Sequence, residues 1–274
     1  MPESLTKANQ IINLMTEIIE GKNLINYQGQ VYAGVDLGTA NIVVTVLDQD
    51  KRPLAGALYP AKVVKDGLVV DYLGAVKIVR HLVKEIEELM GFSLEKAATA
   101  IPPGTRAGDT RAIVNVVEAA DLEVTEVVDE PTAAARVLEI TDGAVVDVGG
   151  GTTGISVLKD GQVIYTADEP TGGTHFNLVI AGNRQVDFDE ADRIKRDPIK
   201  QKEIFPVILP VIQKVAAIVN YHLQKHPVDQ IYLVGGTCCL EGFEQVIEKE
   251  TGIKTFKPAN PLLVTPLGIA MHCK

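Results

Sequence analysis

The chain has 274 residues, and its 36 Asp and Glu against 26 Lys and Arg give a formal net charge of −10 at pH 7, which argues against nucleic acid as the main partner. A hydrophobic content of 46% is typical of a globular protein, and no apolar run predicts a membrane span. The N-terminus lacks a signal-peptide pattern and the three cysteines (Cys238, Cys239, Cys273) suit reduced thiols, so we expect a cytoplasmic protein.

Residues 4–20 have the spacing of an amphipathic helix. The apolar face of this helix consists of Leu5, Ala8, Ile11, Ile12, Met15, Ile18 and Ile19. A polar stretch, 22–30, follows the helix. Residues 1–29 are therefore expected to form a helix and a linker. The helix either packs on its own domain or detaches to dock on a partner, such as a protein shell.

The first strands contain an acid beside a glycine turn. Strands are predicted over 31–37, 42–47 and 54–58, with Asp36 near the end of a buried strand and Gly38, Thr39, Ala40 and Asn41 in the turn after it. A small hairpin over 63–71, turned at Asp66-Gly67, comes next. An acid beside free backbone N–H groups suits a phosphate that carries a metal ion.

The middle of the chain predicts a helix over 75–90, a strand over 97–101, a helix over 110–120 and a strand over 122–128. This strand ends at Asp129, and Glu130-Pro131 begins another helix. Glu130 is either a carboxylate favoured by the helix dipole or a further acid of a site.

A second acid–glycine hairpin, residues 145–158, aligns without a gap with residues 34–47. Asp147 falls on Asp36 and Gly149 on Gly38, and Gly150, Gly151, Thr152 and Thr153 complete the turn. This internal repeat predicts two related halves that hold one phosphate chain from both sides.

The rest of the chain has two more glycine turns. Gly172-Gly173 opens a helix that runs through Ile180, and Gly235-Gly236-Thr237 follows a strand over 230–234. Between them lie a polar stretch, 187–202, expected to be a small surface subdomain, and an apolar helix over 204–223.

Five motifs in this order resemble the actin-like ATPase superfamily. They begin at Asp36, Glu130, Asp147, Val234 and Pro266. The resemblance implies an α/β protein with the actin-like ATPase fold: two duplicated ribonuclease-H-like lobes, five-stranded mixed sheets flanked by helices, and reduced outer subdomains. The first lobe is expected at 30–142 plus 260–274, and the second at 143–259.

The resemblance also implies ATP and Mg²⁺ as ligands. Asp36, Glu130 and Asp147 would be catalytic, with Asp36 and Asp147 holding Mg²⁺ through water and Glu130 orienting the attacking water. The expected nucleotide-binding residues are Gly38, Thr39, Ala40, Asn41, Gly149, Gly150, Gly151, Thr152, Thr153, Gly172, Gly173, Gly235, Gly236 and Thr237. Lys62 and Lys65 are candidates for a lysine near the γ-phosphate, and no residue pair is assigned to the adenine.

Within the superfamily the chain most resembles the EutJ family of ethanolamine-utilisation proteins, in residues 64–76, 129–133 and 167–173. This implies a chaperone-like or reactivating, slow Mg-dependent ATPase associated with a bacterial microcompartment. Its protein partner would be ethanolamine ammonia-lyase or a shell protein. The alternatives are a nucleotide-binding scaffold or filament protein with little turnover, and a small-molecule kinase, for which the outer subdomains are too short.

Overall fold

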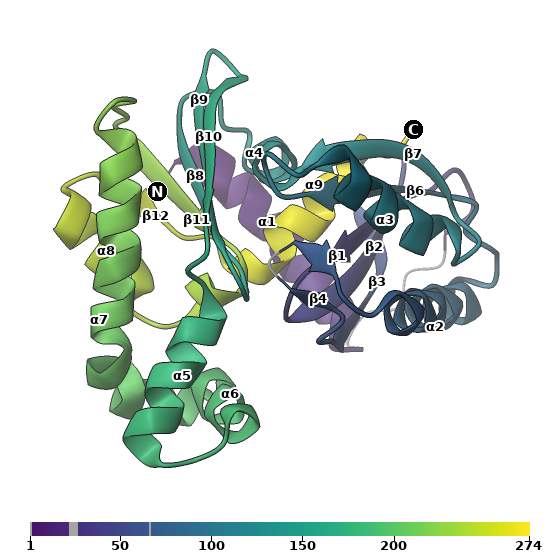
Figure 1. Ribbon diagram of the computed structural model, residues 1–274. Coiled ribbons are helices and arrows are strands. Elements are labelled where there is room, and N and C mark those ends of the chain that lie inside the picture. The colour runs from purple at the N-terminus through teal and green to yellow at the C-terminus, as the bar shows by residue number, and fades with distance from the viewer. Residues whose placement is uncertain (1, 22–26, 66) are drawn as a thin grey trace.

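Two five-stranded mixed sheets form the cores of two lobes in the computed structural model, which describes residues 2–21, 27–65 and 67–274 (Figure 1). The first sheet has the order β3-β2-β1-β6-β7. Its strands are β1 (Tyr32–Leu37), β2 (Asn41–Leu47), β3 (Pro53–Pro60), β6 (Lys96–Ile101) and β7 (Glu123–Asp129). Helices α2 (Tyr72–Met90) and α3 (Ala107–Glu118) bury their apolar residues in the same core as this sheet, and the short strands β4 (Val64–Lys65) and β5 (Leu68–Val69) form the predicted small hairpin.

The second sheet has the order β10-β9-β8-β11-β12, the same arrangement as the first. Its strands are β8 (Gly143–Val148), β9 (Thr153–Lys159), β10 (Gln162–Glu169), β11 (Gln230–Val234) and β12 (Lys254–Phe256). Around it lie α5 (Gly173–Arg184), α6 (Phe188–Arg196), α7 (Pro198–Leu223), α8 (Phe243–Thr251) and the 3₁₀ turn η1 (Gly236–Cys239). In each sheet a meander of three antiparallel strands is followed by two parallel ones.

The sequence repeat is also a repeat of strand register. Asp36 pairs with Val43 across the first hairpin, and Asp147 pairs with Gly154 across the second. These are aligned positions in the two repeats, so both acids have the same place in their hairpins. The structure therefore confirms two duplicated lobes with five-stranded mixed sheets.

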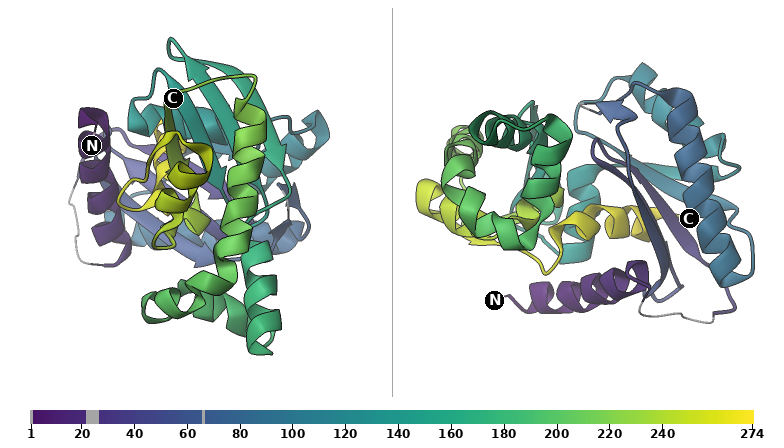
Figure 2. Two further views of the ribbon diagram at one scale, coloured as in Figure 1. Left: turned by 90° about the vertical axis from the view of Figure 1, so that its left-hand side faces the viewer. Right: turned by 90° about the horizontal axis from the view of Figure 1, so that it is seen from below.

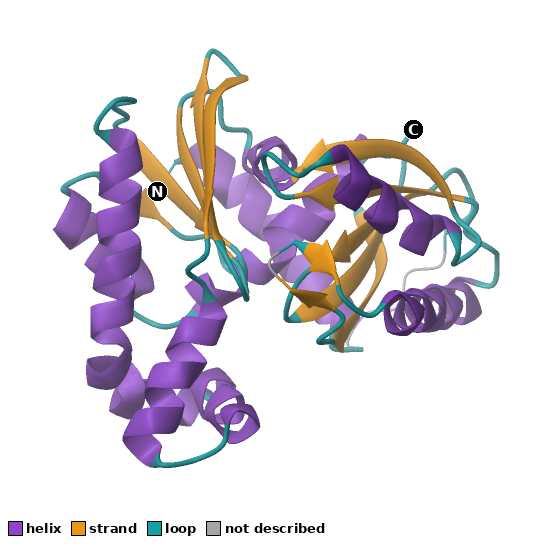
Figure 3. Ribbon diagram, in the orientation of Figure 1, coloured by secondary structure: helices purple, strands orange, loops and turns teal. Residues whose placement is uncertain are grey.

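Two helices lie between the sheets, α4 (Glu130–Leu138) and α9 (Val264–His272), with the 3₁₀ turn η2 (Pro261–Leu263) before α9 (Figure 3). They are built from small residues and pack backbone to backbone. A Cβ on Gly268 would overlap the carbonyl oxygen of Ala133, so this crossing requires glycine. Helix α9 also packs on β1, β2 and β6 of the first sheet.

The N-terminal helix α1 (Glu3–Ile19) packs on its own chain. Leu5, Ala8, Ile12, Met15 and Ile18 are buried, as the spacing predicted. The helix lies against β3 and α4 (Figure 2). Within the predicted linker, residues 22–26 lie outside the described residues, as does Asp66 of the predicted turn. The lobe boundaries given above stay a prediction.

Helix α7 is long and apolar enough to cross a membrane, with a mean hydropathy of 1.6 over its best window. Eight of its residues, including Ile204, Ile212 and Val219, are buried in the core of the second lobe. Burial in this core accounts for the apolar composition of α7, so no membrane is needed to explain it. The helix begins at Pro198, earlier than predicted, because Asp197 caps it by accepting a hydrogen bond from the amide of Ile199.

Candidate functional site

A cavity of about 260 Å³ lies between the lobes, and both acid–glycine hairpins line it. The first hairpin contributes Asp36 and the turn residues Gly38, Thr39, Ala40 and Asn41. The second contributes Asp147, Gly149, Gly150, Gly151 and Thr152, and the predicted residues Glu130, Gly235, Gly236 and Thr237 also line the cavity. Residues from distant parts of the sequence thus meet in one cleft.

Two carbonyl groups in the glycine turn of the second hairpin accept hydrogen bonds from neighbouring residues. The oxygen of Gly149 accepts from the Gly173 amide (2.9 Å) and from the Thr237 hydroxyl (2.8 Å). The oxygen of Gly150 accepts from the amide (2.8 Å) and the hydroxyl (2.9 Å) of Thr174. In a trans peptide the N–H points opposite to the C=O, so the amides of Gly150 and Gly151 face the cleft. Such a pair of amides is suited to an anion.

Three carboxyl groups lie together in the floor of the cleft, where Asp147 is buried and Asp36 and Glu130 are partly buried. Burial and the nearby charge of Asp147 raise the pKa of Asp36 to about 7. Burial also raises the pKa of Asp147 to about 6, against the opposing effect of a hydrogen bond from the Thr265 hydroxyl to its Oδ2 (3.0 Å). The pKa of Glu130 is raised well above its usual value by burial and by both aspartates. A cation or its hydrated form would relieve this repulsion.

Glu130 is not the cap of its helix. Asp129 caps α4 by accepting from the Thr132 amide (3.0 Å) and hydroxyl (2.7 Å). This leaves the carboxyl of Glu130, one residue on, among the residues that line the cavity. Glu130 lies in the first turn of α4 and also lines the cavity, so its position suits both the helix dipole and a site.

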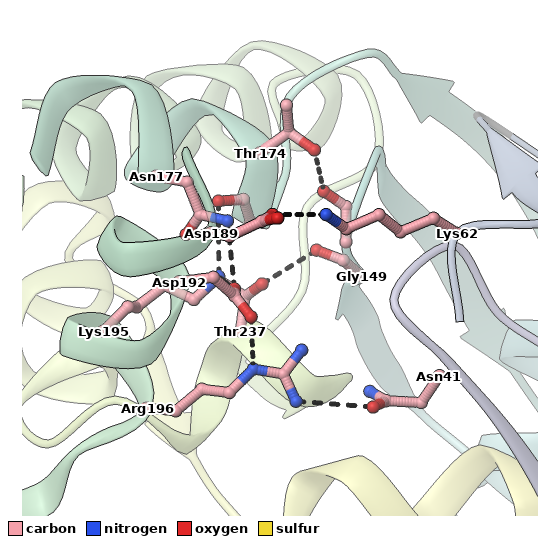
Figure 4. A network of polar contacts seen from close by, with 12 residues as sticks. Asn41, Lys62, Gly149, Thr174, Asn177, Asp189, Asp192, Lys195, Arg196 and Thr237 are labelled. Carbon is pink, nitrogen blue, oxygen red and sulfur yellow. Dashed lines mark hydrogen bonds and ion pairs between the residues drawn. The ribbon is translucent and has the colours of Figure 1, made fainter. Parts of the chain in front are cut away.

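The wall of the cleft opposite β1 carries positive charge from α6. Lys195 and Arg196 line the cavity, and both pair with Asp192, at 2.9 Å and 2.7 Å (Figure 4). The Lys195 side chain is only 12% exposed, and burial lowers its pKa. Both residues lie in the polar stretch 187–202, which was predicted to be a small surface subdomain, and neither was predicted to line a site. Charged residues spaced along a polar helix carried no signal that α6 faces the cleft.

Two polar contacts cross the mouth of the cleft. Arg196 Nη1 donates to Asn41 Oδ1 (3.4 Å), and Lys62 pairs with Asp189 (Figure 4). Lys62 and Lys65 do not line the cavity, so the structure gives neither a place beside a phosphate. Lys195 and Arg196 supply the cationic groups there instead.

Three predicted residues lie behind the cavity rather than on its surface. The Thr153 hydroxyl donates to the Thr171 oxygen (2.5 Å), and the Gly172 amide donates to Nδ1 of His175 (3.3 Å). The Gly173 amide, as above, holds the glycine turn. Since these donors already have partners within the protein, they are not available to a bound phosphate.

The donor set fits a hydrated Mg²⁺ better than a directly coordinated metal. In the part of the chain that the structure describes, no three His, Cys, Asp or Glu side chains are grouped around one metal position. Mg²⁺ retains several waters and is commonly held by one or two carboxylates together with phosphate oxygens. Asp36 and Asp147 both line the cleft and both have raised pKa values. Their carboxyl groups suit the role of holding a hydrated Mg²⁺.

Two lobes of one topology, each presenting an acid–glycine hairpin to a shared cleft, define a member of the actin-like ATPase superfamily. MreB5 of Spiroplasma citri bound to AMPPNP shares the fold, with a TM-score of 0.70 at 15% identity over 89% of this chain and 96% of that one. The ethanolamine utilization protein EutJ of Escherichia coli K12 is 43% identical over 89% of this chain and 86% of its own length. The crystal structure of EutJ from Carboxydothermus hydrogenoformans has a TM-score of 0.94 and 48% identity, covering 98% and 99% of the two chains. The chain belongs to the EutJ family, and the family model of the type IV pilus assembly protein PilM also matches it over residues 104–264.

Proposed function

We propose that this chain binds Mg·ATP between its lobes and acts as a slow, nucleotide-driven switch in ethanolamine utilisation. The observation that carries the proposal is the cleft itself: two hairpins of identical register, amides of Gly150 and Gly151 facing inward, and three repelling carboxyl groups. The nucleotides bound to MreB5 of Spiroplasma citri, which shares the fold, support the choice of ligand.

Each part of the cleft has a role in this proposal. The amides of the two glycine turns bind phosphate oxygens from opposite lobes. Asp36 and Asp147 hold Mg²⁺ through its water, and the ion, when bound, neutralises phosphate charge. Glu130 orients the attacking water and accepts its proton, for which its raised pKa suits it. Lys195 and Arg196 supply positive charge beside the phosphates, and residues 235–237 bind the nucleoside end.

Calorimetric titration of Mg·ATP, with ADP and GTP in parallel, tests the binding. We expect Asp36→Asn to weaken Mg·ATP binding by at least 10-fold, because it removes a charge that holds the hydrated ion. Asp50→Asn, in the exposed turn after β2, makes the same chemical change outside the cleft and should bind as the wild type does. Equal affinities for all three proteins would contradict the assignment.

We further propose that lobe closure controls a protein partner, ethanolamine ammonia-lyase or a microcompartment shell protein, in the cytoplasm. The EutJ relatives support the process through their name, and the match to PilM supports a protein partner. The assay is recovery of inactivated ethanolamine ammonia-lyase with Mg·ATP, compared with Glu130→Gln. If the wild type restores no activity, the shell proteins are tested next by co-sedimentation.

A scaffold that binds nucleotide with little turnover is the second candidate, favoured by the match to a pilus assembly protein over residues 104–264. Single-turnover hydrolysis separates the two. A scaffold binds Mg·ATP tightly and hydrolyses it no faster in the wild type than in Glu130→Gln. A switch loses its hydrolysis with that substitution but keeps its affinity.

A further inference from the structure

Helix α1 packs on the first lobe and extends beside the second. Its C-terminal half lies on the first sheet, where a Cβ on Gly56 of β3 would be 2.5 Å from Met15 Sδ and 3.0 Å from Ile19 Cγ1. A side chain at this position of β3 would displace Met15 and Ile19, so the glycine lets the helix pack closely. At the other end, Ser4 borders a second cavity together with Leu158 and Tyr232 of the second sheet. The right-hand view in Figure 2 shows α1 running along the molecule beside both lobes.

The buried face of α1 belongs to a hydrophobic cluster that includes residues of both sheets. Leu5, Ala8, Ile12 and Met15 are at most 1% exposed. The same cluster contains Val43 and Leu47 of the first sheet and Val145, Leu158, Tyr232 and Val234 of the second. This cluster differs from the separate cores of the two lobes, since its members come from both.

The helix also binds the segment in which the chain returns from the second lobe to the first. Between β12 and α9, the Ala259 amide donates to Asn9 Oδ1 (2.8 Å) and the Asn260 side-chain amide donates to Thr16 Oγ1 (3.2 Å). A segment that connects two lobes must change its backbone angles when the lobes move. Asn9 and Thr16, which lie on different turns of the α1 helix, are therefore both hydrogen-bonded to this connecting segment, a candidate hinge.

From these contacts we infer that α1 is an intramolecular clasp that fixes the angle between the lobes. The helix holds β3, the returning segment and the second sheet in one relative position, so opening of the cleft requires α1 to shift or to leave its groove. Docking of α1 and closure of the cleft are thus coupled, and the coupling acts in both directions. A partner that binds the apolar face of α1 would open the cleft.

The test releases the helix by a substitution far from the cleft. Ile12→Asp places a carboxylate at a position with 0% exposure, and Ile12→Ala is the milder variant should the first not fold. Asn13→Asp introduces the same acid at the next, exposed position of α1 and is the matched control. Ile180→Ala, buried in the second-lobe core alone, controls for general loss of stability.

Hydrogen exchange and small-angle X-ray scattering of the nucleotide-free full-length chain give the result. We expect exchange in α1 to accelerate by roughly 100-fold in Ile12→Asp, with a larger radius of gyration and faster exchange at 38–41 and 188–196, the two sides of the cleft mouth. The control variants should leave the cleft mouth unchanged. If exchange in α1 accelerates while exchange at the cleft mouth and the radius of gyration stay as in the wild type, α1 does not fix the angle between the lobes and the inference fails. If α1 stays protected in both Ile12 variants, its docking does not depend on the shared cluster, and the inference also fails.

A second readout rests on the proposed function. Dissociation of a fluorescent ADP should be several-fold faster from the Ile12 variants than from Asn13→Asp, because the lobes open more often. If the wild type binds no nucleotide, the proposed function fails, while exchange and scattering still decide whether α1 is a clasp.

Discussion

Replacement of Asp36 by asparagine should make the ligand-free protein more stable at pH 8 and unable to hold Mg·ATP. The pKa of Asp36 is about 7 in the folded protein, against 3.8 for an ordinary aspartate. Between these values the unfolded chain loses the proton while the folded protein keeps it, so stability falls as the pH rises. A difference of about 3 units corresponds to roughly 4 kcal/mol of lost stability above pH 7.5.

Asparagine has the same shape and no proton to lose. The free energy of unfolding of Asp36→Asn should therefore equal that of the wild type near pH 4 and exceed it by about 2–4 kcal/mol at pH 8, the lower figure allowing for the remaining acids. Urea unfolding in EDTA at several pH values measures this difference. Asp50→Asn, on the exposed turn, should follow the wild type at every pH.

The reasoning is refuted if Asp36→Asn is no more stable than the wild type at pH 8 without metal. That outcome would mean that water or another group already compensates the charge in the cleft. A gain in stability together with loss of Mg·ATP binding would identify Asp36 as a residue kept for binding at the expense of folding.

Three further substitutions test other parts of the site and its frame. Gly268→Ala should lower the free energy of unfolding in urea by about 3 kcal/mol, because the added methyl group meets the backbone of α4. Gly182→Ala, in an open position of α5, should stabilise the protein slightly. Equal effects of the two substitutions would exclude a tight crossing of α4 and α9. Glu130→Gln should keep Mg·ATP affinity and lower single-turnover hydrolysis by about 100-fold, and a wild-type rate would remove Glu130 from the chemistry. Thr265→Val removes the hydrogen bond that lowers the pKa of Asp147, so calorimetry should show a greater loss of Mg·ATP affinity at pH 6 than at pH 8; a loss independent of pH would assign Thr265 a role in packing only.

The hairpins could be predicted from the sequence because their determinants are local. Alternating apolar residues fix the face of each strand, and the glycine turn fixes the register, so the alignment of residues 34–47 with 145–158 also predicted equivalent pairing. The same reasoning placed Asp36 and Asp147 at equivalent points. Their approach across the cleft followed from the repeat rather than from either hairpin.

The remaining site residues depend on long-range packing that local patterns do not encode. Lys195 and Arg196 reach the cavity because α6 folds back over the glycine turn, and no spacing in a polar stretch reveals that. Gly172 and Gly173 were predicted to face an anion, but a glycine turn does not show which acceptor its amides meet. For α1, the periodicity predicted a buried face and left open what covers it; the structure places this face in a cluster that includes residues of both sheets.

The position of α9 has a consequence for the order of folding during synthesis. The strands β8 to β12 and their helices are continuous in sequence, so the second lobe has all its parts before the ribosome reaches residue 264. The first sheet is synthesised earlier but waits for α9, which packs on β1, β2 and β6. Nascent chains stalled before α9 should therefore expose the apolar inner face of the first sheet to chaperones.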